Sequence, residues 1–216
     1  AAMEILENAS YSDINWLEPT SANVSKVLST YAVNHAMLNP NVLISEFRIL
    51  TALRNGPYGC NYLNKSIERQ IKKELNIPQS MLWFHNRIIM ANKNDYRLGL
   101  RNGELGAYDS VADEVNFAKD KCVSVYQLQS YESGYCITIH KSQGSEYDHV
   151  AIVLPEYENA LLTKELLYTA VTRARKSVLV VGNKKILTHC ITNKTKRKSG
   201  LNKQLIYCQA NSGSQS

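Results

Sequence analysis

The sequence predicts an α/β protein in which a mostly parallel sheet with flanking helices is interrupted by a small β-barrel-like insertion. Apolar runs typical of buried strands occur at 47–50, 135–139, 150–154 and 178–181. Segments with apolar residues at helical spacing follow several of these runs, and such alternation favours a parallel sheet with helices packed on it. Between residues 81 and 134 the helical spacing disappears, and Asn, Asp, Gly and Tyr become frequent. The chain is therefore expected to leave the α/β domain, build a small β domain and return.

Residues 1–39 are interpreted as a linker followed by a lead-in helix. Apolar positions are scattered up to Pro19, whereas the segment from Ala22 to Leu38 has helical spacing and stops before the Pro at position 40. We expect the main domain to begin at residue 40.

The first part of the main domain, residues 40–80, is predicted to contain a strand, a turn and a helix. Gly56 and Pro57 follow the strand at 47–50 and interrupt regular structure. Beyond them four apolar residues recur at every fourth position, which predicts a helix with one buried face. They are Leu63, Ile67, Ile71 and Leu75.

Residues 81–134 are predicted to form the inserted β domain. Asn102 and Gly103 are a strong local signal for a tight hairpin turn. Trp83 and Phe84 are expected to anchor the insertion against the main domain. Three tyrosines have two interpretations: stacking on nucleic-acid bases, or the half-buried packing that is commoner for tyrosines in β domains. They are Tyr126, Tyr131 and Tyr135.

The second part of the main domain is predicted over 135–205, with a tail at 206–216. Its expected order is strand, polar loop, strand, helix, strand, helix. The polar loop belongs to the string TIHKSQGSEYD at 138–148, directly after a strand, where α/β proteins place ligands. The string ELLYTAVTRAR at 165–175 predicts the helix, because its apolar residues form one stripe. The stripe consists of Leu166, Leu167, Ala170, Val171 and Ala174.

These two strings contain groups suited to binding phosphates and a nucleotide. Gly144 lets the backbone approach a ligand closely because it has no Cβ, and Glu146 offers a carboxylate to a ribose hydroxyl. Arg173 lies near the end of the predicted helix, where a permanently charged guanidinium can stabilise a transferring phosphoryl group. A turn with a glycine and a core helix with exposed arginines are the plainer alternatives. Donors suited to phosphate oxygens are Thr138, His140, Lys141, Ser142 and Gln143.

The composition describes a globular protein with a basic C-terminal part. Of the 25 basic and 19 acidic residues, 12 and 5 lie in residues 135–216. The basic run at 194–198 is interpreted first as a solvated terminal face and second as a contact with a phosphate backbone. No apolar run approaches the length of a membrane span, and no signal peptide is visible. The five cysteines form no C-x-x-C pair, so we expect reduced thiols and a cytoplasmic protein.

Two other kinds of site are not expected. His140, Ser142 and Asp148 lie within one short loop and no G-x-S-x-G elbow occurs, so a hydrolase triad is disfavoured. The remaining histidines stand apart from cysteines and carboxylates at ligand spacing, so no metal site is predicted.

Together and in this order, the two strings resemble the fifth and sixth motifs of superfamily 1 DNA helicases, in the version carried by RecD-like proteins, the alpha subunits of exodeoxyribonuclease V. FRILTALRNGPYGCNYLNKSIERQI at 47–71 looks like the segment that opens the second RecD motor domain. RIIMANKNDYRLGLRNGELGAY at 87–108 is similar to the stretch that begins a small β insertion, and residues 197–201 match a closing R-x-S-G-L. The similarity covers about residues 40–205 and implies a RecA-like main domain.

The resemblance also implies a function. It implies the C-terminal motor half of an ATP-dependent 5′→3′ DNA helicase, the RecD subunit that acts in double-strand-break repair and recombination. Arg173 is then the catalytic arginine finger. The residues implied for the nucleotide are Gln143, Gly144, Glu146 and Arg54. The residues implied for contacts with single-stranded DNA are Thr138, His140, Ser142 and Asn64. RecB- and RecC-like subunits are the implied protein partners, and no membrane is implied.

The sequence lacks the groups that would hold most of the nucleotide. No G-x-x-x-x-G-K-[ST] loop occurs, and no acidic pair follows an apolar strand. ATP and Mg²⁺ are therefore expected to be bound mainly by an N-terminal motor domain that this chain lacks, and the chain alone is expected to hydrolyse no ATP. The alternative is a non-catalytic nucleic-acid-binding or scaffold protein that retains a helicase-like domain.

Overall fold

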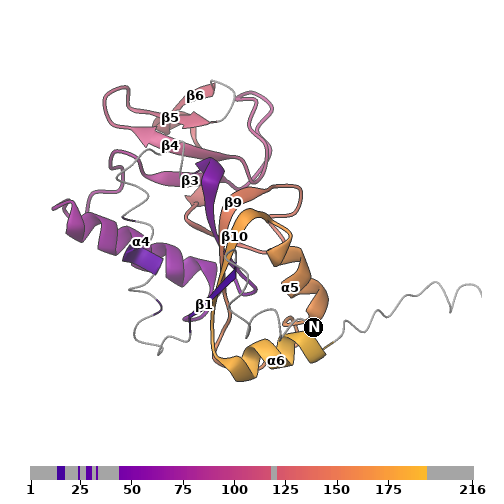
Figure 1. Cartoon of the computed structure of the whole chain (residues 1–216). Helices are drawn as coiled ribbons and strands as arrows, with labels where there is room; N and C mark the ends of the chain where they lie inside the picture. The colour runs from indigo at the N-terminus through magenta and orange to yellow at the C-terminus, as the bar shows by residue number, and fades with distance from the viewer. Residues whose placement is uncertain are drawn as a thin grey trace, which may run out of the picture.

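Two sheets organise the chain (Figure 1), whose structure is a computed structural model. The structure describes residues 14–17, 24, 28–30, 33, 44–117 and 121–193. The basic run at 194–198, the closing string at 197–201 and the tail at 206–216 lie outside the described residues.

The first sheet has five strands, and every neighbouring pair is parallel. In spatial order they are β1 (Ile14–Leu17), β10 (Ala174–Val181), β9 (Tyr147–Val153), β2 (Phe47–Thr51) and β8 (Cys136–Thr138). The last four residues of β9 and the whole of β2 are buried, as expected for strands of a parallel sheet covered on both faces. The predicted mostly parallel sheet is confirmed.

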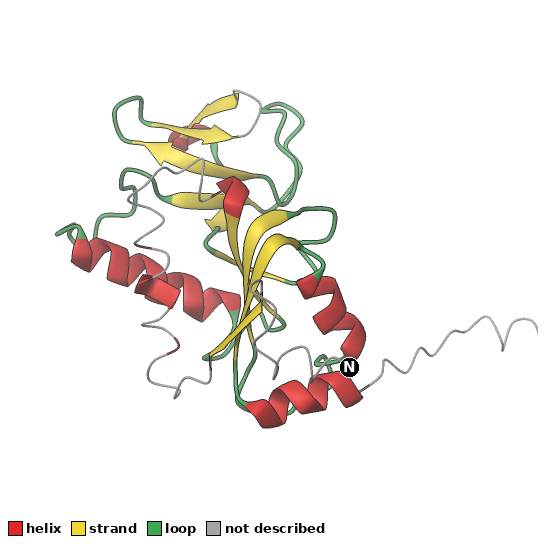
Figure 2. Cartoon of the chain, in the orientation of Figure 1, coloured by secondary structure: helices red, strands yellow, loops and turns green. Residues whose placement is uncertain are grey.

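Helices cover the two faces of this sheet (Figure 2). α4 (Cys60–Glu74) lies on one side, and α5 (Lys164–Val171) lies on the other with α6 (Lys184–Thr192) beside it. Side-chain caps fix where α5 and α6 begin: Thr163 accepts from the Leu166 N–H at 3.2 Å, and Asn183 accepts from the Ile186 N–H at 2.8 Å. The predicted order of strand, loop, strand, helix, strand and helix after residue 135 is confirmed.

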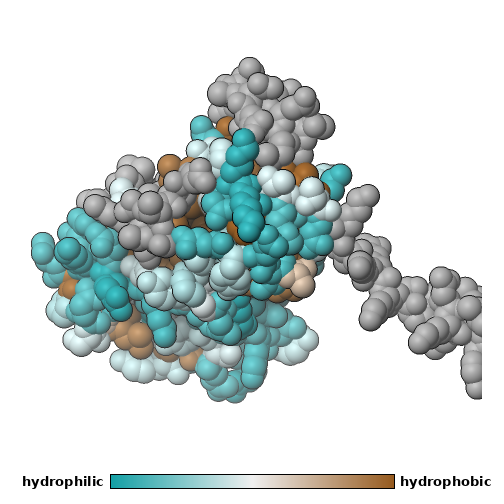
Figure 3. All heavy atoms as spheres, turned by 90° about the horizontal axis from the view of Figure 1, so that it is seen from below, coloured by the Kyte–Doolittle hydropathy of each residue, from teal (hydrophilic) through white to brown (hydrophobic). Residues whose placement is uncertain are grey.

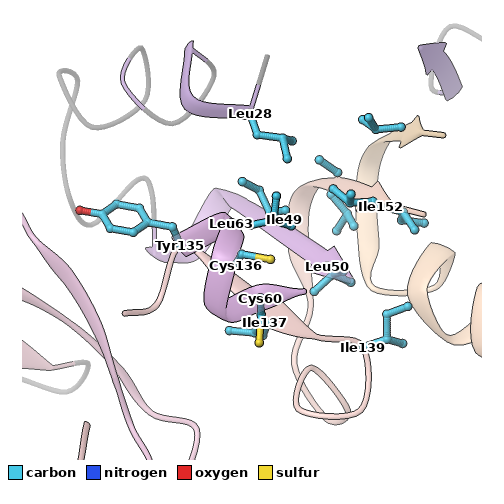
Figure 4. Packing of buried hydrophobic residues seen from close by; sticks show 14 of the residues in the cluster. Leu28, Ile49, Leu50, Cys60, Leu63, Tyr135, Cys136, Ile137, Ile139 and Ile152 are labelled. Atoms are coloured by element: carbon cyan, nitrogen blue, oxygen red, sulfur yellow. The ribbon is translucent and has the colours of Figure 1, made fainter. Parts of the chain in front are cut away.

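The main core lies where α4 meets the sheet (Figure 4). Ile49, Leu50 and Ile152 of the strands are fully buried and pack in one cluster with Leu63 and Leu28. Leu28 comes from the segment predicted as the lead-in helix. Its residues 24, 28–30 and 33 are helical in the structure.

α4 has the predicted buried stripe, but the stripe ends one turn early. Leu63, Ile67 and Ile71 are at most 2% exposed, whereas Leu75 follows the last helical residue and is 41% exposed. The helix starts at a close approach of two backbone segments: a Cβ on Gly59 would lie 2.5 Å from the backbone of Asn55. Only glycine fits that position.

The second sheet is antiparallel and lies within residues 88–133. Its strands in spatial order are β6 (Lys121–Ser124), β5 (Glu114–Phe117), β4 (Leu105–Asp109), β3 (Ile88–Ala91) and β7 (Tyr131–Ser133). A 3₁₀ turn, η1 (Val125–Gln127), joins β6 to the approach to β7. At the predicted Asn102-Gly103 turn, the Glu104 N–H donates to the Arg101 carbonyl at 3.1 Å, directly before β4. The expected insertion is therefore present as a five-stranded sheet.

Adjacent aromatic residues join the two sheets, as predicted. Trp83 packs on Tyr108 and Tyr131 of the second sheet, with ring centroids 5.1 Å apart in both pairs. Phe84 is buried in the main core. Stacking on a base requires an exposed ring. Of the three tyrosines, only Tyr126, which is 87% exposed, retains that interpretation.

Two elements differ from expectation. β1 lies in the segment interpreted as a linker, and its Trp16 Nε1 donates to the Gly182 carbonyl at 2.8 Å. It is a four-residue edge strand, too short to show a pattern in the sequence. Ala174 belongs to β10 and not to the helical stripe, because α5 ends at Val171 and backbone pairing with β9 begins at Ala174.

On the face shown in Figure 3, the described surface is mostly hydrophilic, with hydrophobic atoms in separate patches. Among the described residues, no helix is long and apolar enough to cross a membrane. Cys60, Cys122, Cys136 and Cys190 are free thiols.

Candidate functional site

The predicted site residues lie at two opposite ends of the parallel sheet. Thr138 at the end of β8 is level with Thr51, and Thr51 is level with Val153 at the end of β9. Tyr147, where β9 begins, is six residues back along that strand, which is about 20 Å at the usual rise per residue. The segment 139–146 therefore runs from the carboxyl end of the sheet to its amino end.

At the carboxyl end, this segment begins with a tight turn. The Ser142 N–H donates to the Thr138 carbonyl at 3.2 Å, and the Lys141 N–H reaches Thr138 Oγ1 at 3.4 Å. His140 is exposed at the tip of the turn, and Thr138 is partly exposed. Thr138 and His140, both predicted to contact DNA, are thus brought to one accessible place.

Ser142 and Asn64, also predicted to contact DNA, are buried instead. Ser142 is fully buried and donates to the Ile139 carbonyl at 2.7 Å. Asn64 is 6% exposed, and its side chain makes three bonds with the backbone where the insertion returns to β8: it donates to Ser133 at 2.9 Å and Cys136 at 2.8 Å, and accepts from the Cys136 N–H at 2.8 Å. Neither side chain reaches the surface; a contact with DNA would require these bonds to break.

Arg54 lies at the carboxyl end, although it was grouped with the nucleotide residues. It follows β2, and its Nη2 lies 3.1 Å from the Glu132 carboxylate on β7. The other oxygen of Glu132 lies 2.6 Å from Lys141 Nζ. The structure therefore separates Arg54 from Arg173, because Arg173 precedes the amino end of β10. Arg54 lies instead with Lys141.

The Cys60 thiol at the start of α4 interacts electrostatically with Arg54, Lys141 and Glu132. Burial raises the pKa of this thiol; the Glu132 carboxylate raises it further, while Arg54 and Lys141 oppose the shift. The thiol is therefore protonated at neutral pH, and it lies 3.7 Å from the Arg54 carbonyl.

Midway along the segment, Gln143 and Gly144 are exposed. Gly144 has φ +86°, which side chains with a Cβ rarely adopt, and a Cβ there would meet nothing within 4 Å. Its requirement for glycine is conformational, and the space beside it is open to a ligand.

At the amino end, Arg173 is held by main-chain oxygens. Its Nη1 donates to the Ser145 carbonyl at 3.0 Å and its Nε to the Thr169 carbonyl at 3.2 Å. No ion pair joins Arg173 to an acid in the part of the chain that the structure describes. The guanidinium is thus oriented by the fold while its charge is left without a carboxylate partner.

The neighbouring cations at this end are paired. Arg175 Nε lies 3.2 Å from the Glu146 carboxylate, and both side chains are exposed. Lys176 Nζ lies 2.6 Å from Asp148. The hydrogen bond from Lys176 holds the pKa of Asp148 below its usual range, and the same bond raises the pKa of Lys176. Arg173 differs from these neighbours in lacking an acid.

A hydrolase triad is not formed by the described residues. Asp148 lies on β9 and pairs with Lys176, while Ser142 is buried against its own turn. Another grouping, His85 with Asp109 and Ser110, presents both partners to the same ring nitrogen, Nδ1. A relay needs the acid and the hydroxyl on different nitrogens. No group of three metal-ligating side chains occurs among the described residues.

The sequence contained no indication of Glu132 and no role for Arg175, and it indicated Lys141 only as one of several donors suited to phosphate oxygens. Glu132 lies in the insertion, 78 residues from Arg54 and 9 residues from Lys141, and no local pattern revealed that it pairs with both. Arg175 lies in the string that contains Arg173, but on β10, whereas Arg173 precedes that strand.

Comparison with known proteins agrees with these motifs. Residues 133–181 match the family described as UvrD-like helicase C-terminal domain. The match begins at the end of β7 and includes all of β8, β9, α5 and β10.

The chain is also related to RecD subunits, so the predicted resemblance is confirmed. It is 37% identical over 164 residues to the RecBCD enzyme subunit RecD of Mycolicibacterium smegmatis, which covers 75% of this chain and 30% of that protein. It is 37% identical over 171 residues to the RecD subunit of Haemophilus influenzae, covering 76% of this chain and 26% of that one. The ATP-dependent RecD2 DNA helicase of Deinococcus radiodurans is 31% identical over 144 residues, 63% of this chain and 20% of that protein. The chain thus spans about three tenths or less of the length of these relatives.

Among solved structures, a Pif1 helicase from Bacteroides in complex with ADP-AlF3 and single-stranded DNA matches with a TM-score of 0.45 and 15% identity. That match covers 92% of this chain and 55% of the Pif1 chain.

Proposed function

We propose that this chain is the C-terminal motor part of an ATP-dependent, RecD-like DNA helicase. The observation that carries the proposal is the arrangement of the helicase-like motifs on one sheet. The segment 138–146 presents Thr138 and His140 at the carboxyl end and connects them, through the Ser145 carbonyl, to Arg173 at the amino end, which pairs with no acid among the described residues. One end suits a nucleic-acid backbone and the other suits a nucleotide.

The amino end fits the edge of a nucleotide. Arg173 would offer a phosphate an oriented cation that no described acid neutralises. Gln143 and Gly144, shortly before Ser145 in the same segment, are exposed, and a Cβ on Gly144 would meet nothing within 4 Å. Glu146 would accept from a ribose hydroxyl after leaving its exposed pair with Arg175. ATP, with Mg²⁺, would supply the free energy of phosphoanhydride hydrolysis. In this chain Arg173 would stabilise the charge that develops on the phosphates.

The carboxyl end fits single-stranded DNA. Thr138 and His140 offer a hydroxyl and an imidazole next to each other on an accessible turn, and such groups bind phosphate oxygens without selecting a sequence. Because Ser142 and Asn64 are buried, we assign them to the support of this turn and of α4, and not to DNA.

The segment 139–146 would couple nucleotide binding at the amino end of the sheet to DNA binding at the carboxyl end. Arg173 holds the Ser145 carbonyl, so a phosphate that draws this guanidinium away would release the same segment whose other end carries Thr138 and His140. ATP-driven changes at the amino end would then alter the grip on DNA at the carboxyl end.

The relatives extend the proposal to the whole protein. Their names place RecD in the RecBCD enzyme, so we propose RecB- and RecC-like subunits as partners, 5′→3′ movement, a role in double-strand-break repair and recombination, and a cytoplasmic location. A non-catalytic scaffold is the alternative, and ATP turnover separates the two.

The test measures DNA-stimulated ATP hydrolysis by the gene product that contains this chain. Arg173→Ala should lower kcat by about a thousandfold or more, as expected for an arginine finger, while the protein still binds single-stranded DNA. Arg69→Ala is the control, because Arg69 is an exposed arginine on α4, away from the segment 139–146. Turnover equal to the unmodified protein in Arg173→Ala would refute the assignment of Arg173. Absence of DNA-stimulated turnover in the unmodified protein would favour the scaffold.

A further inference from the structure

Three charged side chains meet at the carboxyl end of the sheet: Glu132 and Lys141 are nine residues apart, and Arg54 is 78 residues from Glu132. Glu132 on β7 places one carboxylate oxygen 2.6 Å from Lys141 Nζ and the other 3.1 Å from Arg54 Nη2. Asn92, which follows β3, adds a bond to Lys141 Nζ at 3.1 Å. The insertion therefore supplies an acid and an amide to two cations that belong to the loops of the main sheet.

Both cations retain donors that face solvent. Lys141 has three N–H donors, of which the carboxylate of Glu132 and the amide oxygen of Asn92 take two. Arg54 has five, its side chain is 56% exposed, and one bond to Glu132 is formed. The group of three carries a net charge of +1, so it attracts an anion although Glu132 is present.

The location of this group indicates which anion it suits. Lys141 is directly next to His140 in the exposed turn, and Arg54 follows the strand that is level with Thr138. Arg173 lies at the other end of the sheet, about 20 Å away along β9. The two cations therefore belong with the nucleic-acid end and not with the nucleotide end.

We propose that Arg54 and Lys141 together bind one backbone phosphate of single-stranded DNA, and that Glu132 is the internal counter-anion of this site. The inference deepens the proposed function and rests on its DNA-binding part. In the free protein Glu132 holds the two cations side by side. When DNA binds, its phosphate first shares the two cations with Glu132 and then replaces Glu132 as their partner. The contact between the insertion and the main-domain loops then weakens. The insertion thus sets how tightly this end holds DNA.

The sign of the effect of Glu132 distinguishes a counter-anion from a purely structural residue. Glu132→Gln keeps the shape of the side chain and removes its negative charge, so the repulsion that opposes a phosphate a few ångströms away disappears. A counter-anion then predicts tighter binding of DNA. Structural damage at the same position predicts weaker binding or none.

The experiment measures binding of a fluorescein-labelled oligothymidylate to the 216-residue chain by anisotropy across a salt series. Lys141→Ala and Arg54→Ala should each weaken binding about fivefold and reduce the salt slope by about 0.7, the value for one phosphate contact on a single strand. Glu132→Gln should bind at least about threefold more tightly than the unmodified chain. Thermal melting of each variant checks that it is folded.

Glu104→Gln is the matched control for Glu132→Gln. Glu104 is also an ion-paired glutamate of the insertion, 2.9 Å from Lys121 Nζ, and its substitution changes the net charge equally. If Glu132→Gln binds no more tightly than Glu104→Gln, the counter-anion is refuted while the DNA-binding function stands. If Lys141→Ala and Arg54→Ala leave the salt slope unchanged, the phosphate site is refuted. If the unmodified chain fails to bind the oligonucleotide, the DNA-binding part of the proposed function fails as well.

Discussion

The two ends of the parallel sheet differ in how their cations are held. At the carboxyl end Arg54 and Lys141 share one carboxylate, Glu132, which comes from the inserted sheet. At the amino end Arg173 is fixed by two carbonyl oxygens and the Thr172 hydroxyl, while Arg175 and Lys176 beside it have acids. A carbonyl orients a guanidinium without neutralising it, whereas a carboxylate does both. The amino end thus has one cation preorganised for a strong anion, and the carboxyl end has a pair whose attraction is moderated.

The difference suits two kinds of ligand. A nucleotide phosphate that changes charge during a reaction is stabilised best by a fixed and unpaired cation. A DNA strand that has to be bound and then released is better matched by a group of charges with a moderate net charge, because contacts that are too strong would oppose its release. Four further changes test this comparison, from the largest expected effect to the smallest.

Asn64→Ala should lower the free energy of unfolding by about 3 kcal/mol, because three buried hydrogen bonds between α4 and the backbone near β8 are lost and their backbone partners stay buried. Urea denaturation measures it. Asn61→Ala is the control: the side chain of this exposed neighbour on α4 donates to the Asn55 side chain at 2.8 Å and accepts from the Cys60 thiol at 3.9 Å, and it makes no bond with the backbone near β8 among the contacts described. If Asn64→Ala left stability unchanged and instead weakened DNA binding, Asn64 would belong to the DNA contacts of the carboxyl end after all.

Thr138→Ala combined with His140→Ala should weaken binding of oligothymidylate about tenfold, the effect of losing two modest hydrogen bonds to phosphates. Anisotropy at fixed salt measures it. Thr188→Ala is the control, since Thr188 is exposed and lies on α6, which contributes no residue to either proposed ligand site. An affinity equal to that of the control would remove Thr138 and His140 from the DNA contacts.

Gly144→Ala should cost about 1 kcal/mol of stability, because alanine is strained at φ +86°. Gly103→Ala is a close control: Gly103 has φ +87°, and a Cβ there also meets nothing within 4 Å. Both variants should lose similar stability in urea denaturation. Only Gly144→Ala should also alter DNA-stimulated ATP turnover, since Gly144 lies on the segment that joins the two ends. Equal turnover in the two variants would argue against that segment as the link.

Asp148→Asn should have the smallest effect, and its size should depend on pH. The pKa of Asp148 is lowered by Lys176, so the pair stabilises the folded state above the usual pKa of an aspartate and loses this contribution as pH falls through the lowered value. The difference in Tm between Asp148→Asn and the unmodified chain should therefore be present at pH 7 and shrink below about pH 4. A difference that persists at low pH would mean that the pair does not act through charge.

The sequence predicted the parts of the fold that depend on local pattern. The apolar run at Phe47–Thr51 and the spacing of Leu63, Ile67 and Ile71 identified β2 and α4 correctly, because burial on a known period leaves a direct trace. β10 was predicted too short, since its first residues include Arg175, Lys176 and Ser177, which leave no hydrophobic signal. The pairing with β9 also shifts register between Ala174 and Ser177.

The site was less predictable, because its charges are paired across the fold. In the sequence, Asn64 is a polar residue near the start of a predicted helix. Its burial depends on where the chain returns from the insertion to β8, 69 to 72 residues later. Arg54 and Glu132 are 78 residues apart. Such contacts depend on how the two sheets dock, and no local pattern encodes that.

The most direct test of separate roles for the two ends measures ATP turnover and single-strand affinity side by side in Arg173→Ala and Lys141→Ala, using the gene product that contains this chain. Arg173→Ala should lose turnover and keep its DNA affinity within about twofold, while Lys141→Ala should lose about fivefold in affinity and retain turnover at saturating DNA. Loss of both properties in both variants would contradict a sheet whose two ends bind two different ligands.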